Sequence, residues 1–268
     1  MLQITAFFAS LLAFIYVNLT VSVIKLRRRH KVSLGYKNHK DLEQAIRSQA
    51  NFIEYVPFGL ILLSCLEINK IHPLIVFIHG AGQTKLCWNY YLTILNPKRF
   101  IMLEYNVETP FYETLDILYN IIKDEKDMFF ISHSMGGLIA MHLYDKLRPQ
   151  VLGSISISSP FGGSKTADWA RYIIPRYTLF RDVGVHSAPV LTSLNIEIKN
   201  IKWTQIISTA GGVPWHGGAN DGVVTVESQY AHSNMSKVEF AVNHYESISS
   251  PIILNLIKKE IKEIKISA

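Results

Sequence analysis

The pattern of hydrophobic positions divides the chain into two parts. Up to about residue 70, apolar residues form long, nearly unbroken stretches. From residue 71 onward, short runs of apolar, β-branched or aromatic residues alternate with segments of helical pattern. This alternation is typical of βαβ units, in which helices cover both faces of a mostly parallel sheet. We therefore predict a membrane region over 1–70 and an α/β domain over 71–268.

The second part contains six candidate strands and four candidate helices. The strands are predicted at 74–79, 99–105, 128–132, 151–157, 203–209 and 237–242. The helices are predicted at 85–95, 111–123, 135–147 and 251–264. Residues 160–200 mix Gly, Pro and aromatic residues and fit the alternation least well, so we predict a short cap there. Apolar candidates for residues of the cap are Trp169, Tyr172, Phe180 and Trp215.

The N-terminal stretch 2–24 carries no charge and is long enough to cross roughly 30 Å of hydrocarbon as a helix. A cleavable signal peptide has its positive charges before the apolar run, whereas here the basic residues follow it. The stretch therefore predicts a retained membrane anchor. A helix from about Asp41 to Leu66 contains a second apolar segment, and we predict a second span over about 48–68.

The net charge of +6 is concentrated in residues 25–40, which contain many Lys and Arg and no Asp or Glu. Basic residues beside an apolar span indicate the cytoplasmic flank of a membrane segment rather than a nucleic-acid surface. We predict no nucleic-acid partner. If both apolar segments span the membrane, the α/β domain lies outside the cytoplasm; if only the first does, the domain is cytoplasmic. The two cysteines, Cys65 and Cys87, form no disulfide framework and no metal motif.

Four polar residues in the membrane region follow a helical spacing. Glu43, Arg47, Asn51 and Glu54 are separated by steps of four and three, which keep them on one face of a helix. Ionisable groups in membrane helices usually face the interior of a bundle. This E-x-x-x-R-x-x-x-N-x-x-E pattern resembles the second helix of the MAPEG family, small four-helix membrane proteins that include glutathione transferases. The two later helices of that family have no counterpart here, so a transferase remnant is only an alternative interpretation.

A serine lies on a predicted sharp turn in the stretch ISHSMGGLIA, residues 131–140. Such a turn between strand and helix lifts the side chain of Ser134 off the sheet edge, and the following helix directs its positive end toward charge that forms there. The usual G-x-S-x-G pattern has Ser132 at its first position here, which is small enough for the turn. His133 occupies the variable position, where we expect it to tune the nucleophile and contact substrate.

The first predicted strand ends in a glycine-rich loop, HGAGQ. We predict that the backbone N–H groups of Ala81 and Met135 stabilise an oxyanion formed on attack by Ser134. His79 and Gly80 are expected to shape this loop and contribute to substrate binding.

An acid and a base are expected after the last two strands. Asp221 follows the fifth predicted strand and His244 follows the sixth. The order Ser, Asp, His along the chain fits a nucleophile, an orienting acid and a general base. His216 and His232 are alternative bases, but His216 precedes the acid and His232 precedes the last strand.

This order of elements and side chains resembles the α/β-hydrolase fold, and within it lipases and esterases similar to GPI inositol-deacylases. The segment SSPFGGS (158–164) resembles the T-P-H-x-G-S loop of such lipases, and NDGVVTVES resembles their N-D-G-V-V segment. Phe161 replaces the histidine that this loop often has, and we include it among the substrate-binding candidates. The resemblance implies acyl transfer from an ester to Ser134, with no cofactor and no metal.

The sequence therefore predicts a membrane-anchored serine hydrolase that cleaves a small-molecule or lipid ester with a hydrophobic part. A non-catalytic binding protein on a hydrolase fold is a second alternative. The acyl length, the acceptor of the acyl group and the oligomeric state stay open.

Overall fold

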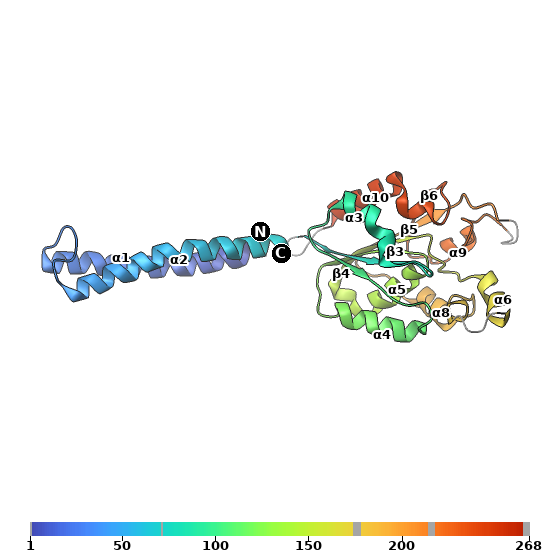
Figure 1. Ribbon diagram of the computed structural model, residues 1–268, viewed down its shortest axis with the longest axis horizontal. Coiled ribbons are helices and arrows are strands. Elements are labelled where there is room, and N and C mark those ends of the chain that lie inside the picture. Colours follow the sequence, from blue (N-terminus) through green and yellow to red (C-terminus); the bar gives the residue numbers. More distant parts are fainter. Residues whose placement is uncertain (1, 71, 174–177, 214–217, 265–268) are drawn as a thin grey trace. The chain divides into compact units, whose positions relative to one another are not determined.

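The computed structural model describes residues 2–70, 72–173, 178–213 and 218–264 (Figure 1). These residues form two compact units, one ending at His72 and the other beginning at Pro73. Two of the sequence candidates, Trp215 and His216, lie outside the described residues, and the side chain of Phe180 is also outside the description.

The N-terminal unit consists of two long helices, α1 (Gln3–His30) and α2 (Lys40–Lys70). Both are long and apolar enough to cross a membrane, with a mean hydropathy of 2.1 in the most apolar part of α1 and 1.3 in that of α2. α1 continues past the predicted span 2–24, and α2 starts before the predicted span 48–68. The loop that connects the helices is therefore shorter than the basic segment 25–40. Lys31 ends α1 in a left-handed conformation, with φ 53°.

Polar contacts join the start of α1 to the end of α2, so the two helices run antiparallel. The Glu67 carboxylate accepts hydrogen bonds from the N–H groups of Ile4 (2.9 Å) and Thr5 (2.8 Å) and from the Thr5 hydroxyl (2.7 Å). These N–H groups have no partner within their own helix, and a negative charge is favourable at that helix end. Farther along, Gln49 donates to the Thr20 hydroxyl at 2.9 Å.

All six predicted strands are present in the second unit, within one or two residues of the expected bounds. They are β1 (Leu74–Ile78), β2 (Phe100–Leu103), β3 (Met128–His133), β4 (Val151–Ile157), β5 (Lys202–Ser208) and β6 (Ser236–Phe240). Among the described residues they form one parallel sheet with the order β2-β1-β3-β4-β5-β6. Along the chain, β2 is added on one side of β1, and β3, β4, β5 and β6 are then added in order on the other side. Ligands of such sheets bind at the carboxyl ends of the strands near this reversal.

Helices cover both faces of the sheet (Figure 1). On one face lie α4 (Phe111–Ile122) and α5 (Met135–Leu147), and on the other α3 (Asn89–Leu95) and α10 (Pro251–Glu263). Alternate residues of β1 enter the two cores: Val76 packs in the α4–α5 cluster, and Phe77 packs with Trp88 on the opposite face. The α/β prediction is therefore confirmed. The predicted helix 85–95 differs in that its first turn is the 3₁₀ segment Lys85–Trp88.

The region between β4 and β5 contains short helices, which are α6 (Lys165–Ile173), α7 (Thr178–Asp182) and α8 (Ala188–Asn195). The Asp182 carboxylate accepts the N–H of Phe111 at 3.0 Å, which ties α7 to the start of α4. Burial raises the pKa of this carboxyl. The remaining elements are η2 (Arg148–Gln150), α9 (Val226–Tyr230) and η4 (Glu246–Ser249).

Candidate functional site

Ser134 stands on the turn between β3 and α5 in a strained conformation. Its φ of 52° and ψ of −127° lie outside the regions that residues with a side chain normally occupy. The turn is held because the N–H of Ser134 donates to the carbonyl of Ile157 at 2.8 Å. Strain of this kind persists where the surroundings over-determine it, and it concentrates at functional sites. The side chain is 9% exposed and lines a cavity.

The turn packs directly on the end of β1, backbone against backbone. A β-carbon at Gly136 would lie 2.5 Å from the carbonyl oxygens of Ile78 and His79. Only glycine allows this approach. Ser132, which departs from the usual pattern, is fully buried and donates to the Ile155 carbonyl at 3.3 Å.

Replacing Gly136 with alanine is expected to destabilise the protein by about 1–3 kcal/mol, because the new methyl group meets backbone that cannot rotate away. Thermal unfolding of the full chain measures the loss. Gly218→Ala is a matched control, because nothing lies within 4 Å of the β-carbon that it adds. Equal Tm values for the two variants would contradict the close approach at Gly136.

The loop after β1 is fixed by side chains that bind its carbonyl groups. His79 Nδ1 donates to the Gly80 carbonyl at 2.8 Å, and the Tyr105 hydroxyl donates to the His79 carbonyl at 2.8 Å. The His79 and Tyr105 rings are stacked, with centroids 4.2 Å apart. Burial lowers the pKa of His79, which keeps the imidazole neutral so that Nε2 accepts the Tyr105 N–H at 3.3 Å. The two peptide planes before Ala81 are thereby held in place.

Ala81, Ser134 and Met135 line the same cavity. Within the described ranges, the N–H groups of Ala81 and Met135 make no hydrogen bond to the protein. The N–H of Gly80, by contrast, donates to Gln83 Oε1 at 3.0 Å. Two unengaged donors beside a serine hydroxyl match the arrangement that stabilises an oxyanion.

Asp221 and His244, far apart in the sequence, form a short and buried hydrogen bond. His244 Nδ1 lies 2.7 Å from Asp221 Oδ2, and the exposed fractions of the two residues are 3% and 1%. The other carboxylate oxygen accepts the N–H groups of Val223 (2.9 Å) and Val224 (2.7 Å). Gln229 Nε2 donates at 3.3 Å to Oδ2, the oxygen that faces His244. The carboxylate is therefore fixed by the turn that follows it and can orient the imidazole.

His133 links the elbow to the loop that carries His244. Its ring centroid lies 4.6 Å from that of His244, and its Nε2 lies 3.0 Å from the His244 carbonyl. Its Nδ1 lies 2.9 Å from Gln83 Oε1, the same oxygen that accepts the Gly80 N–H. Burial holds the pKa of His133 well below its ordinary value. The chain of contacts from Gly80 through Gln83 and His133 therefore joins the oxyanion loop to the His244 loop.

Both ring nitrogens of the alternative base His232 are engaged in hydrogen bonds to the backbone of other residues. Its Nε2 donates to the Ile196 carbonyl at 3.2 Å, and its Nδ1 accepts the N–H of Asn234 at 3.3 Å. Phe161, a candidate for substrate contact, is fully buried and packs edge-on against His232, with centroids 5.9 Å apart. Phe161 is not among the residues that line the cavity at Ser134, so its observed contacts are those of a core residue.

Three polar residues of this region were given no role in the sequence prediction. Gln83 and Gln229 make the contacts described above, and Asn220 fixes the turn before Asp221 through bonds to Val213 and Gly222. Asn220 belongs to the N-D-G signal, but neither glutamine has a spacing that marks it. Among the described residues, no group of His, Cys, Asp and Glu side chains is arranged to hold a metal ion.

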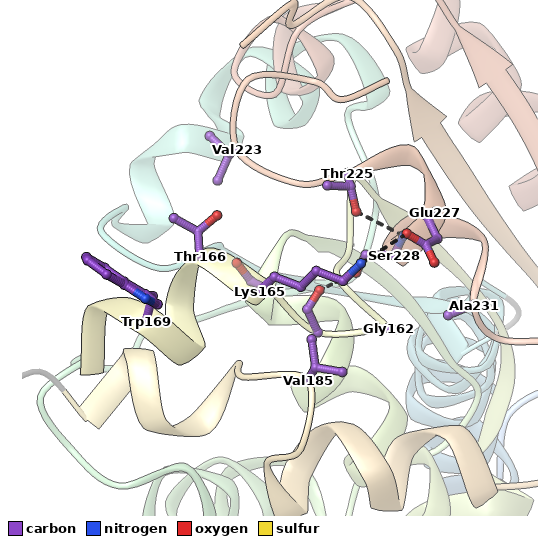
Figure 2. A pocket seen from close by; sticks show the side chains of 12 residues that line it. Gly162, Lys165, Thr166, Trp169, Val185, Val223, Thr225, Glu227, Ser228 and Ala231 are labelled. Carbon is purple, nitrogen blue, oxygen red and sulfur yellow. Dashed lines mark hydrogen bonds and ion pairs between the residues drawn. The ribbon is translucent and has the colours of Figure 1, made fainter. Parts of the chain in front are cut away.

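Two cavities lie at this end of the sheet. The cavity at Ser134 has a volume of about 250 Å³, and most of its lining residues are apolar. A larger cavity of about 630 Å³ is lined by residues from the loop after β4, α6 and α9 (Figure 2). Ser164, Thr166 and Val223 line both cavities, so the two are adjacent.

The N-terminal part of the sequence is similar to membrane proteins. Residues 5–83 match the sequence model of the MAPEG family. The inner membrane protein YecN of Escherichia coli strain K12 is 30% identical over 78 residues, which is 29% of this chain and 60% of YecN. The chain thus spans less than two thirds of the length of the curated relatives that it matches.

The second unit is similar in fold to solved lipases. The mature lipase BlEst2 of Bacillus licheniformis superposes with a TM-score of 0.55 at 15% identity, over 71% of this chain and 92% of that one. The phospholipase PlaB of Legionella pneumophila gives a TM-score of 0.59 at 10% identity, over 72% and 60% of the two chains. Residues 75–212, more than half of the sequence, match the sequence model of the alpha/beta hydrolase family. Together with the parallel sheet and the serine elbow, this match shows that the chain belongs to the alpha/beta hydrolase family.

Proposed function

We propose that this protein is a membrane-anchored serine hydrolase that cleaves carboxylic esters with a hydrophobic part. The observation that carries the proposal is the strained Ser134, which lines an apolar cavity near the buried Asp221–His244 pair. The lipase and phospholipase folds that resemble the second unit support an ester substrate by analogy only.

In the proposed reaction, Ser134 Oγ attacks the ester carbonyl carbon while His244 Nε2 takes the hydroxyl proton. The negative charge moves to the carbonyl oxygen, where the N–H groups of Ala81 and Met135 stabilise it. The carbon–oxygen bond to the alcohol then breaks, and His244 returns the proton to the leaving oxygen. Water, activated by His244, hydrolyses the acyl-serine to give the carboxylic acid and free serine. Asp221 stabilises the imidazolium that forms in both steps.

An assay on the purified, detergent-solubilised full chain tests the activity. We expect hydrolysis of p-nitrophenyl esters and progressive inactivation by a fluorophosphonate probe. If the acyl group passes to an added alcohol faster than to water, the protein is an acyltransferase instead. A folded protein that cleaves no ester and takes up no probe would favour the alternative of a non-catalytic binding protein.

The proposal includes a membrane location for the N-terminal unit. The apolar helices α1 and α2 and the likeness to an inner membrane protein support it. We expect the full chain to stay with the membrane pellet after washing at high salt and at alkaline pH, because spanning helices resist both treatments. Release by either wash would contradict the anchor. Specific, saturable glutathione binding would revive the alternative of a MAPEG-type transferase.

Gln83 is proposed as a positioning residue, because its Oε1 accepts the Gly80 N–H of the oxyanion loop and lies in contact with His133, 2.9 Å from Nδ1. Replacing Gln83 with alanine is expected to lower kcat by about 10-fold to 100-fold with a smaller change in KM, because the two loops lose their shared support. Gln150→Ala is the matched control, since Gln150 bonds only the Lys123 carbonyl on the surface. A change in KM alone, or an equal effect of both substitutions, would exclude the positioning role.

A further inference from the structure

The cavity that contains Ser134 is small and has apolar walls. Met135, Ala167, Val183 and Val224 contribute to it, and their exposed fractions range from 2% to 8%. A carboxylic ester has an acyl part and an alcohol part on opposite sides of the carbonyl that Ser134 would attack. Apolar walls favour an alkyl chain over hydroxyl groups, because buried hydroxyls without partners cost free energy. The acyl part therefore fits this cavity.

The volume limits the length of that acyl chain. A cavity of about 250 Å³ holds roughly eight groups the size of a water molecule, each of which takes about 30 Å³ in the liquid. A methylene group has a similar size. An acyl chain of about eight carbons therefore fills the cavity, and a longer chain has to extend out of it.

The second cavity offers different chemistry next to the first. Lys165 Nζ and Glu227 Oε2 lie 3.7 Å apart at its edge, and Figure 2 shows Lys165 extended toward Glu227. The hydroxyls of Thr225 and Ser228 make hydrogen bonds within the protein. The Thr225 hydroxyl accepts the Ser228 N–H at 3.2 Å, and the Ser228 hydroxyl donates to the Gly163 carbonyl at 2.6 Å.

A neutral polyhydroxyl group suits this cavity better than an ion does. The Lys165–Glu227 pair carries no net charge that would attract an ion, whereas a hydroxyl group can donate to the carboxylate and accept from the ammonium. Trp169, which is 73% exposed and lines the same cavity, offers a flat apolar face to the C–H groups of a ring. Because Ser164, Thr166 and Val223 line both cavities, an alcohol joined to the carbonyl at Ser134 can extend into the larger one.

We propose that the substrate is an amphiphilic ester, in which a short or medium acyl chain occupies the Ser134 cavity and a bulky polyhydroxyl alcohol occupies the cavity between Lys165, Glu227 and Trp169. This inference rests on the proposed ester hydrolase. It assigns the substrate's bulk to the alcohol side of the ester bond.

Two substrate series test the two cavities separately on the detergent-solubilised full chain. p-Nitrophenyl esters from acetate to palmitate probe acyl length, and we expect kcat/KM to fall by at least about tenfold beyond about eight carbons. Glucose 6-octanoate and methyl octanoate share one acyl group and probe the alcohol, and we expect a higher kcat/KM for the glucose ester.

Variants then assign each preference to its cavity. Ala167→Phe fills the smaller cavity and is expected to move the optimum to shorter chains. Lys165→Met and Glu227→Gln are each expected to lower the ratio of kcat/KM for the glucose ester over the methyl ester by about fivefold, because an exposed charged partner of a hydroxyl is lost. Lys146→Met is the matched control, since Lys146 pairs with Asp116 on the surface away from both cavities.

The outcomes separate the inference from the proposed function. Ester cleavage with fluorophosphonate labelling, but with palmitate equal to octanoate, would overturn the acyl assignment. The alcohol assignment would be overturned if Lys165→Met and Glu227→Gln, like the control Lys146→Met, leave the ratio of kcat/KM for the glucose ester over the methyl ester unchanged. This test does not depend on whether Ala167→Phe folds. No cleavage of any ester and no labelling would instead refute the ester hydrolase itself.

Discussion

Replacing Ser134 with alanine is expected to lower kcat for ester hydrolysis by about 10⁴-fold or more, because the hydroxyl that forms the acyl-enzyme is gone. KM should change little, since the cavity walls and the two N–H donors stay in place. Loss of the hydroxyl also relieves no strain, because the backbone of the turn is fixed by the Ile157 carbonyl and the close approach at Gly136. Steady-state kinetics on p-nitrophenyl esters of the preferred length measure the effect.

Ser132→Ala is the matched control for this prediction. Ser132 lies two residues before Ser134, near the end of β3, and is also buried, but its hydroxyl donates to the Ile155 carbonyl. We expect its kcat to stay within about tenfold of the wild-type value, as for loss of one weak hydrogen bond. If Ser134→Ala retains comparable activity, the nucleophile is another residue.

Replacing Asp221 with asparagine is expected to lower kcat by about 10⁴-fold while the fold is retained. The amide oxygen would take the position that accepts the Val223 and Val224 N–H groups, because those donors cannot move. The amide NH₂ would then face His244 Nδ1 and force the proton onto Nε2, the nitrogen that must accept a proton from serine. The defect should therefore appear in kcat and in the loss of fluorophosphonate labelling.

Asp116→Asn provides the matched control, since Asp116 is exposed and pairs with Lys146 on the surface. Its kcat and Tm should equal those of the wild type, because exposed pairs contribute little to stability. A folded Asp221→Asn enzyme with full activity would show that His244 needs no orienting carboxylate.

Most of the fold could be predicted from the sequence because each strand has a clear local sequence pattern. Runs such as 74–78 and 128–133 are short, apolar and bounded by turn residues, and both are fully buried in the sheet. The long apolar helices were equally clear. The 3₁₀ turn at Lys85–Trp88 was not, because a segment of 4 residues is too short to distinguish the period of a 3₁₀ helix from that of an α-helix. What sets it is tertiary packing, with Trp88 fully buried against Phe77.

The parts of the candidate site that could be predicted are the catalytic candidates that follow strands. The contacts between side chains of different loops could not be predicted. Ser134 directly follows β3, Asp221 lies in the loop between β5 and α9, and His244 lies shortly after β6, so the parallel topology brings all three to the carboxyl edge of the sheet. Gln83 reaches His133 over a separation of 50 residues, and no local pattern reports that contact. The cavities could not be inferred either, because their walls combine segments around Ala81, Ser134, Ala167 and Val223.

We propose Ser134 as the nucleophile of an ester hydrolase. The most direct measurement is stoichiometric reaction of the full chain with a fluorophosphonate, followed by peptide mass spectrometry and by parallel assay of the residual ester hydrolysis. We expect a single adduct, located on Ser134, and a loss of activity proportional to its formation. An adduct on another residue, or activity that survives complete modification of Ser134, would contradict it.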